Sequence, residues 1–205
     1  MTADFIYLAS ESPRRRALLA QIGVRFQLLA VAVDESTVPG ETAEQYVARV
    51  CLMKAAAGAA ARPARQAAPV LAADTAVVLD GSILSKPTDA EDGARMLRRL
   101  SGRAHEVLTA VTLATPRGMQ SRLCRSQVTF RTIGDEEARA YWDTGEPRDK
   151  AGGYAIQGRA AVFIADLKGS YSGVMGLPLY ETAALLAMEG VPVWRTPVSG
   201  TQHEH

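Results

Sequence analysis

The residue that points most specifically to chemical function is Asp74, which lies inside the apolar run VLAADTAVVL. A carboxylate is costly to bury in a strand unless it is paired with a cation, hydrogen-bonded or bound to a metal ion. Two interpretations follow from this pattern. Asp74 either forms a structural ion pair with a buried arginine, or acts as a metal ligand or general base in an active site.

Two more carboxylates, Asp34 and Glu35, come directly after the apolar run FQLLAVAV, which we predict to be a strand over residues 26–33. Carboxylates at the end of a strand are well placed for a cleft. Together with Asp74 they would supply the oxygen ligands that Mg²⁺ or Mn²⁺ prefers. The spacing leaves open whether Asp34 or Glu35 meets the metal.

The segment SESPRRR, residues 10–16, places arginines directly after a Ser-Pro step. Ser12 is predicted to be a helix N-cap, with Pro13 at the first helical position, where its missing N–H costs nothing. Cations at a helix start are unfavourable by roughly 0.3–1 kcal/mol each. The arginines are therefore better explained by an anion that binds them and the free backbone N–H groups, with a solvated basic turn as the alternative.

Two lysines complete a set suited to phosphate chemistry. Lys54 lies on the helix predicted after residues 34–35, and Lys86 stands in a Ser-Lys-Pro step just before another helix. Either lysine alone is typical of a protein surface. Beside the Ser-Pro-Arg-Arg segment, they would neutralise phosphate oxygens while Asp74 orients or deprotonates water.

The sequence excludes several common active sites. A Ser-His-Asp triad could use only His105, because the other histidines, His203 and His205, lie at the end of the chain. Glycine motifs of the P-loop or dinucleotide-binding type are missing. The cysteines, Cys51 and Cys124, are far apart and lack zinc-binding spacing. His105 is therefore expected to be a hydrogen-bonded structural residue.

The composition is that of an ordinary soluble protein of 205 residues with a formal net charge of +1. This near-balance argues against a general nucleic-acid-binding or membrane-surface protein, which would need a basic excess. The N-terminal residues do not resemble a signal peptide, and apolar runs stay below the ~20 residues of a membrane span. We expect a cytoplasmic protein.

The elements that must position these residues predict an α/β protein with a mixed central sheet. Thr42 with Gln45, and Thr88 with Glu91, match capping boxes that open two helices. Asp80-Gly81 predicts a tight turn. The expected strands cover residues 5–9, 26–33, 70–79, 105–115, 122–133, 160–167 and 191–194. The expected helices cover residues 14–21, 42–61, 89–100, 136–142 and 180–189.

Seven motifs follow one another along the chain: SESPRR (residues 10–15), ADT (73–75), KP (86–87), LSG (100–102) with His105, YAIQG (154–158), GSY (169–171) and GLPL (176–179). Together they resemble the Maf family of nucleoside triphosphate pyrophosphatases, from residue 5 to about residue 188. The resemblance implies a three-layer α/β/α fold with an elongated mixed sheet, two lobes and a central cleft, similar to the inosine triphosphate pyrophosphatases. It implies one domain over residues 1–198, followed by a disordered tail over 199–205.

The resemblance also implies a reaction: hydrolysis of a nucleoside triphosphate between its α and β phosphates, giving the monophosphate and pyrophosphate, with a divalent cation, Mg²⁺ or Mn²⁺. Asp74 would be the general base, and Glu35 would hold the metal with it. The residues implied to position the triphosphate are Ser10, Arg14, Arg15, Lys54 and Lys86. Members of the family often form homodimers.

Three positions resemble the subgroup that acts on dTTP and UTP: Arg14, Thr75 and Gln157. The 7-methyl-GTP subgroup has a glutamate where Gln157 stands. A neutral amide suits the mixed donor and acceptor edge of uracil or thymine, whereas a carboxylate suits the donor edge of guanine. Which of dTTP, UTP and modified pyrimidine nucleotides is preferred is left open.

Two alternatives remain beside this enzyme: a nucleotide-binding regulator of cell division or septum formation that uses the cleft without turnover, and a 7-methyl-GTP pyrophosphatase. The presence of Asp74, Glu35 and Lys86 favours an enzyme, while Gln157 opposes 7-methyl-GTP. One departure from the family pattern is Glu11, which stands where a small residue is common and would weaken a phosphate site if it pointed inward.

Overall fold

The computed structural model describes residues 4–63 and 68–194, whose strands form one mixed sheet. The strands are β1 (Ile6–Leu8), β2 (Phe26–Leu28), β3 (Val70–Leu79), β4 (Ser82–Leu84), β5 (Ala104–Thr115), β6 (Gly118–Phe130) and β7 (Ile164–Lys168). The α-helices are α1 (Pro13–Gln21), α2 (Ala43–Ala61), α3 (Ala90–Leu100), α4 (Asp135–Asp143), α5 (Tyr171–Met175) and α6 (Leu179–Met188). Three 3₁₀ helices are η1 (Glu146–Asp149), η2 (Ala151–Gly153) and η3 (Arg159–Phe163).

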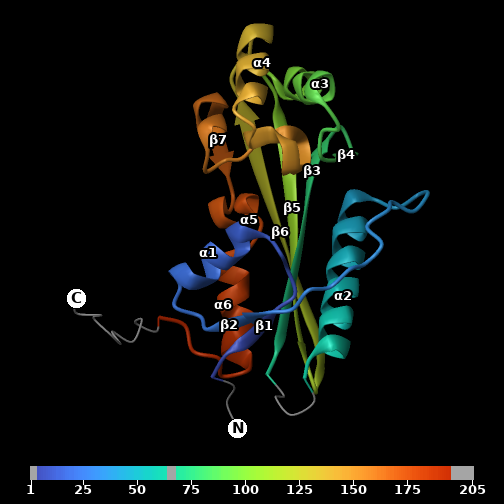
Figure 1. Cartoon of the computed structure of the whole chain (residues 1–205), viewed down its shortest axis with the longest axis vertical. Coiled ribbons are helices and arrows are strands. Elements are labelled where there is room, and N and C mark those ends of the chain that lie inside the picture. Colours follow the sequence, from blue (N-terminus) through green and yellow to red (C-terminus); the bar gives the residue numbers. More distant parts are fainter. Residues whose placement is uncertain (1–3, 64–67, 195–205) are drawn as a thin grey trace, which may run out of the picture.

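The sheet is built around three long strands, β3, β5 and β6, which contain 10, 12 and 13 residues. They are antiparallel to one another, whereas β1 and β2 join the edge beyond β3 in parallel, giving the order β2-β1-β3-β5-β6-β7 with β4 on β3. Figure 1 shows α2 on one side of the lower half of the sheet, and α1 and α6 on the other. The predicted α/β fold with a mixed sheet is confirmed.

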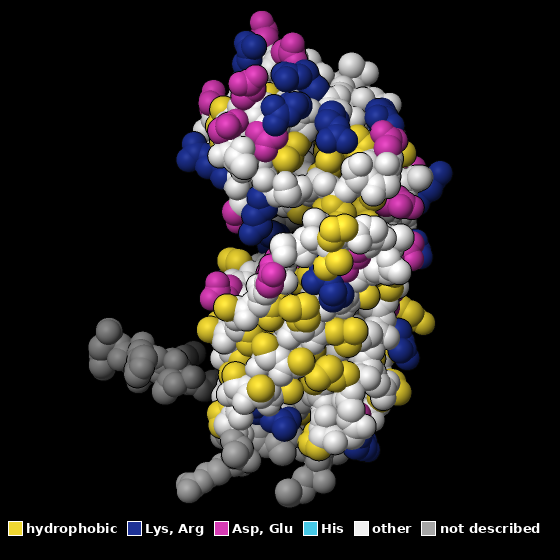
Figure 2. Space-filling model, turned by 90° about the vertical axis from the view of Figure 1, so that its right-hand side faces the viewer, with side chains coloured by type: hydrophobic (Ala, Val, Ile, Leu, Met, Phe, Trp, Pro, Cys, Tyr) yellow, Lys and Arg dark blue, Asp and Glu magenta, His cyan; other side chains and the backbone are white. Residues whose placement is uncertain are grey.

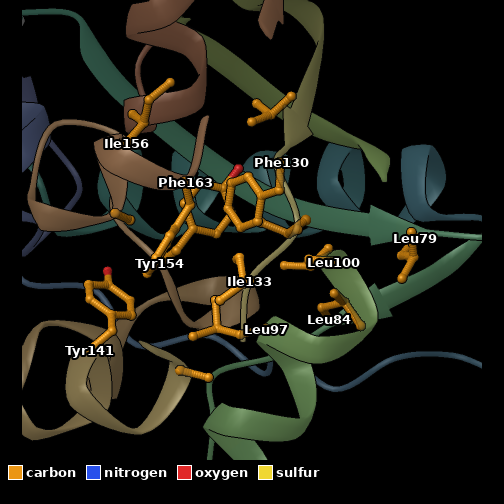
Figure 3. Close-up of a cluster of buried hydrophobic side chains, with 14 of the residues drawn as sticks. Leu79, Leu84, Leu97, Leu100, Phe130, Ile133, Tyr141, Tyr154, Ile156 and Phe163 are labelled. Atoms are coloured by element: carbon orange, nitrogen blue, oxygen red, sulfur yellow. The ribbon is translucent and has the colours of Figure 1, made fainter. Parts of the chain in front are cut away.

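Three groups of buried apolar side chains hold these layers together. One lies under α2 and includes Val47 and Cys51, and a second lies under α1 and α6 and includes Leu19 and Leu185. The third fills the upper end, where α3 and α4 cover the long strands. Figure 3 shows its centre, with the rings of Tyr154, Phe130 and Phe163 gathered beside the side chains of α3.

The surface differs between the two ends of the molecule. Figure 2, which views the side on which α2 lies, shows apolar side chains spread over the lower half and lysine, arginine and acidic side chains over the upper end. Much of the lower face is the alanine-rich outer side of α2, where Leu52 is also exposed. Within the described residues, no helix has the length and hydropathy that a membrane span requires.

The helix starts follow local capping chemistry. The capping box of α2 is confirmed, because Gln45 N donates to Thr42 Oγ1 at 3.2 Å and Thr42 N donates to Gln45 Oε1 at 2.9 Å. The predicted box at Thr88 is wrong by one residue. Asp89 caps α3 by accepting from the backbone N–H of Asp92 at 2.8 Å, since an aspartate carboxylate is as good a cap as a threonine hydroxyl.

The predicted tight turn at Asp80-Gly81 is also confirmed. Both residues have positive φ, 52° and 74°, as in the hairpin turns that glycine and aspartate favour, and β4 runs back antiparallel to β3. The turn brings the segment that carries Lys86 back along the strand that carries Asp74.

Four predicted strands differ from the structure. The strand predicted over residues 122–133 is β6, which runs from Gly118 to Phe130. β2 ends at Leu28 instead of residue 33, because its partner β1 is only three residues long. Residues 159–163 form η3, which places Ala160 and Phe163 in the upper core at a spacing of three, and the strand begins only at Ile164. Residues 191–194 are not in a strand. The predicted tail at 199–205 lies outside the described residues.

The contact between α2 and the sheet depends on Gly58. A Cβ built on Gly58 would lie 2.7 Å from Val70 Cγ1 and 2.9 Å from Ala9 Cβ, closer than such atoms normally approach. We expect Gly58→Ala to lower the free energy of unfolding by about 1–3 kcal/mol, because the added methyl group pushes α2 away from the sheet. Urea denaturation would measure this.

The matched control is Ala60→Gly on the exposed side of the same helix, which reports helix propensity alone and should cost up to about 1 kcal/mol. If Gly58→Ala instead stabilised the protein by about that amount, propensity would dominate and the close packing of α2 would not be a constraint.

Candidate active site

A cavity of about 440 Å³ opens between the β1–α1 turn, β3, α2 and the loop that contains η1 and η2. This volume is typical of sites for small molecules. All the site residues predicted from the sequence line it: Ser10, Arg14, Arg15, Glu35, Lys54, Asp74, Thr75, Lys86 and Gln157. Residues up to 147 positions apart in the chain, from Ser10 to Gln157, thus come together around one cavity.

The centre of the cavity is a lysine between two carboxylates. Lys54 Nζ lies 2.7 Å from Asp74 Oδ1 and 2.8 Å from Glu35 Oε1. Asp74 is only 5% exposed, whereas the side chain of Glu35 is 52% exposed. The cation paired with Asp74 is therefore a lysine from α2, and the alternative of a pair with a buried arginine is wrong.

The choice between the two neighbouring carboxylates follows from the loop after β2. Asp34 is absent from the cavity lining, and its Oδ1 accepts from the backbone N–H of Ser36 at 2.9 Å. That hydrogen bond lowers the pKa of Asp34. Asp34 thus closes a local turn, and Glu35 is the one that reaches the cavity.

The electrostatics of Asp74 are set by opposing influences. Burial raises the pKa of the Asp74 carboxyl above its usual value, because the charged form loses its water. The Lys54 ammonium and the Arg15 guanidinium act in the opposite direction, and Glu35 adds to the rise. A raised pKa makes a carboxylate a stronger proton acceptor, which is the property that a general base requires.

Asp74 and Glu35 provide a donor set that suits a hard divalent cation. Both carboxylates approach the same Lys54 Nζ, so their oxygens converge on one region of the cavity. Mg²⁺ in nucleotide sites is commonly bound by one or two carboxylates, with water and phosphate oxygens completing the octahedron. Among the described residues there is no cluster of three or more His, Cys, Asp or Glu side chains arranged to hold a metal alone.

The two arginines after Pro13 have different roles. Arg15 is partly buried and donates from Nε to Gly176 O at 2.8 Å, from Nη1 to Ser10 Oγ at 3.1 Å and from Nη2 to Thr75 Oγ1 at 3.3 Å. These bonds join α1 to β3 and to the C-terminal end of α5. Arg14 borders the cavity, and the structure gives it no hydrogen bond of this kind within the described residues.

Ser10 and Thr75 serve this arrangement through their hydroxyl groups. Ser10 Oγ accepts from Arg15 and also from the backbone N–H of Ser12 at 3.2 Å, so its own hydrogen remains to be donated. Ser12 is the N-cap of α1 as predicted, although its side chain makes no capping bond. Thr75 Oγ1 lies 3.0 Å from Thr109 Oγ1, which donates to Gly173 O at 2.8 Å.

The rim of the cavity carries exposed polar residues. Lys86, Gln157 and Glu11 all line it and are all exposed. Gln157 lies in a turn closed by the Gly158 N–H and Ala155 O at 3.0 Å, after the buried Tyr154 that anchors this segment in the upper core (Figure 3). The side chain of Gln157 is thus presented at the cavity by a rigid support.

His105 is structural, as expected. It is 3% exposed, does not line the cavity, and its Nε2 lies 2.8 Å from the hydroxyl of Tyr154. Burial lowers the pKa of His105 to about 4, so the ring is neutral at physiological pH. Its contribution is to hold Tyr154 in place beneath the segment that carries Gln157.

Sequence reasoning missed several residues of the site. Asp149 and Lys150 line the cavity from the segment just before the YAIQG motif, and their adjacent opposite charges beside that motif were the available signal. Thr109 and the apolar lining residues Val107 and Met175 carried no signal. Their side chains reach the site only because β5 pairs with β3 and α5 packs against β5.

The different contacts of the arginines lead to a prediction about stability. We expect Arg15→Lys to lower the free energy of unfolding by about 2 kcal/mol or more, because an ammonium cannot reproduce three bonds in the guanidinium plane. Arg14→Lys should change it by less than about 0.5 kcal/mol. Urea denaturation would compare the two variants, and equal losses would show that Arg15 does not tie the segments together.

Comparison with known proteins shows the family of this chain. A family described as Maf-like protein matches residues 5–189. Proteins named dTTP/UTP pyrophosphatase from Saccharophagus degradans and Aromatoleum aromaticum are each 53% identical to this chain, covering 93% and 92% of it and 91% and 97% of their own lengths. A protein of the same name from Burkholderia pseudomallei is 55% identical over 89% of this chain and 92% of its own. The chain belongs to the Maf-like protein family.

Proposed function

We propose that this protein is a nucleoside triphosphate pyrophosphatase that hydrolyses dTTP and UTP to the monophosphate and pyrophosphate. The observation that carries the proposal is the buried Asp74, paired with Lys54 in a cavity that also collects Arg14 and Lys86. Relatives that are 53–55% identical over about nine-tenths of the chain bear the name dTTP/UTP pyrophosphatase, which supports the choice of substrate.

In this proposal Asp74 is the general base. Its carboxylate accepts a proton from a water molecule as that water attacks the α-phosphorus, and the bond to the bridging oxygen of the leaving pyrophosphate breaks. A divalent cation, Mg²⁺ or Mn²⁺, held by Asp74 and Glu35 would neutralise charge on the phosphate oxygens when bound. Lys54 keeps Asp74 oriented and ionised.

The cations around the cavity would bind the rest of the triphosphate. Lys86 and Arg14 border the cavity without competing protein partners among the described ion pairs, so they are available to phosphate oxygens. Ser10 has a hydroxyl hydrogen to donate beside the start of α1. Arg15 and Thr75 also line the cavity, and in this proposal their mutual bond fixes the wall against which the substrate binds.

Selection of a pyrimidine is assigned to Gln157. Its exposed amide lies on the cavity rim and can both donate to and accept from the edge of uracil or thymine. A 7-methyl-GTP enzyme would favour a carboxylate at this place. The extra methyl group of thymine is worth only about 1 kcal/mol in a pocket, so we propose that dTTP and UTP are both substrates.

The proposal extends to the cellular setting of the enzyme. A net charge of +1 does not favour a nucleic-acid or membrane partner, and free nucleoside triphosphates are the expected ligands. We propose a cytoplasmic homodimer. Sedimentation velocity of the purified protein would test the assembly, and a monomer at micromolar concentration would contradict it.

The proposed function is tested by a nucleotide panel. With Mg²⁺ or Mn²⁺, we expect pyrophosphate from dTTP and UTP in preference to CTP, GTP and 7-methyl-GTP, and no orthophosphate. Asp74→Asn should reduce kcat by about 10²-fold or more, because the amide cannot accept the proton. Circular dichroism serves as the control for folding.

The outcomes of the panel separate the alternatives. Binding of nucleotides without turnover by the wild type would favour the regulatory protein. Preferential hydrolysis of 7-methyl-GTP would contradict the role of Gln157. Full activity of Asp74→Asn would show that another group activates the water.

The positive charge of Lys54 beside Asp74 leads to a prediction about how kcat/KM depends on pH. Because the base must be ionised, kcat/KM falls as the pH drops through the pKa of Asp74. Lys54 lowers that pKa, so Lys54→Met should raise it and move the acid limb of the profile to higher pH, while Lys54→Arg keeps the limb near its original position. Initial rates across a pH series would measure the limb, and an unmoved limb in Lys54→Met would exclude Asp74 as the titrating group.

A further inference from the structure

A third lysine borders the cavity besides Lys54 and Lys86. The side chain of Lys150 is only 14% exposed, and its Nζ forms an ion pair with the carboxylate of the preceding residue, Asp149, whose side chain is 69% exposed. An ion pair with a solvent-exposed partner contributes little to stability, commonly about 0–1 kcal/mol. The pair therefore does not by itself account for a lysine held against the cavity wall.

The backbone around Lys150 is fixed to the elements that carry the other site residues. Gly152 N donates to Ser85 O at 3.0 Å, one residue before Lys86, and Gly153 N donates to Lys150 O at 2.9 Å. Gly152 has a φ of +70°, and a Cβ built on it would lie 2.8 Å from Val77 Cγ1 on β3. Only glycine permits this approach, and it places Lys150 on a segment docked against the strand of Asp74.

The counter-ion of Lys150 also lies near a second cation of the site. The pKa of Asp149 is lowered by its hydrogen bond from Lys150 and further by the charge of Arg14. Asp149 and Arg14 belong to different walls of the cavity, the η1–η2 loop and the start of α1. The Asp149 carboxylate is thus paired with Lys150 and within electrostatic reach of Arg14, at a cavity wall where a phosphate group of a bound nucleotide would meet both cations.

We propose that Lys150 binds the pyrophosphate portion of the nucleoside triphosphate, and that Asp149 is the counter-ion from which Lys150 is released when the substrate enters. This inference rests on the proposed function. A lysine ammonium is a mobile point charge suited to phosphate oxygens, and the exchange of one anion for another keeps it paired throughout. Asp149 then competes with the substrate for Lys150.

Because Asp149 competes with the substrate for Lys150, substitutions of these two residues should change KM in opposite directions. With UTP as substrate, Lys150→Met should raise KM about tenfold or more with a smaller change in kcat, because a charge-assisted contact to the substrate is lost. Asp149→Asn should lower KM about two- to threefold, because the competing anion is removed. Lys150→Arg should retain most of the affinity. The matched control is Lys168→Met, which should leave KM unchanged, because Lys168 is 74% exposed, does not line the cavity and has its partner Asp166 only 4.0 Å away on the same strand.

Binding of the product distinguishes phosphate recognition from a structural role. UMP lacks the pyrophosphate, so its Kd, measured by calorimetry, should be the same in the wild type and Lys150→Met. If the ion pair only supported the loop, both Lys150→Met and Asp149→Asn would raise KM, and UMP would bind more weakly to each. A higher KM of Asp149→Asn would overturn the proposal, and so would weaker binding of UMP to Lys150→Met.

A failure of the proposed function would be recognised separately. If the wild type released no pyrophosphate from dTTP or UTP, the enzyme proposal would fail, and Lys150 would be judged by calorimetry with the non-hydrolysable α,β-methylene-UTP. Weaker binding of this probe to Lys150→Met, with unchanged binding of UMP, supports the assignment. Equal binding of the probe to both proteins overturns it.

Discussion

The ion pair between Lys54 and Asp74 is the constraint on which the site and much of the fold depend. Removing two charges from water is costly, and breaking a buried pair typically destabilises a protein by about 3–5 kcal/mol. The pair forms only where α2 packs tightly on β3, and Gly58 and Cys51 make that approach close: Cys51 Sγ lies 3.5 Å from Ala72 O. The packing that buries the lower core therefore also positions the carboxylate of Asp74.

Arg14 and Arg15 differ in their contacts, although both belong to the short segment that opens α1. Arg15 donates to acceptors in the β1–α1 turn, in β3 and at the C-cap of α5, and these bonds fix the start of α1 to the centre of the sheet. Burial lowers the pKa of Arg15, but the nearby Asp74 opposes this, so the two walls of the cavity are electrostatically linked. Arg14, one residue earlier, is left to face the cavity. Rigid support behind a charged surface is what orients a substrate without reorganisation.

Local chemistry made the long elements predictable. The limits of β3 agree with its apolar run, the Asp80-Gly81 turn forms as expected, and α2 begins at its capping box. The sequence predictions were wrong where a neighbouring element in the fold sets the limits of a strand. β2 stops when β1 stops, and η3 forms because Phe163 must reach the upper core, although its residues have the composition of a strand.

The sequence by itself determined the chemical types of the site: a carboxylate in an apolar strand, arginines at a helix start, and a glutamine in a glycine-rich turn. These follow from residue type, local propensity and family resemblance. Tertiary structure alone decided that Lys54 pairs with Asp74, that Glu35 and not Asp34 reaches the cavity, and that Arg15 rather than Arg14 is hydrogen-bonded to distant segments. It also brought Lys150 to the site. The physical reason is that periodicity sets which face a residue occupies within its own element, whereas distances between elements depend on how their buried faces pack.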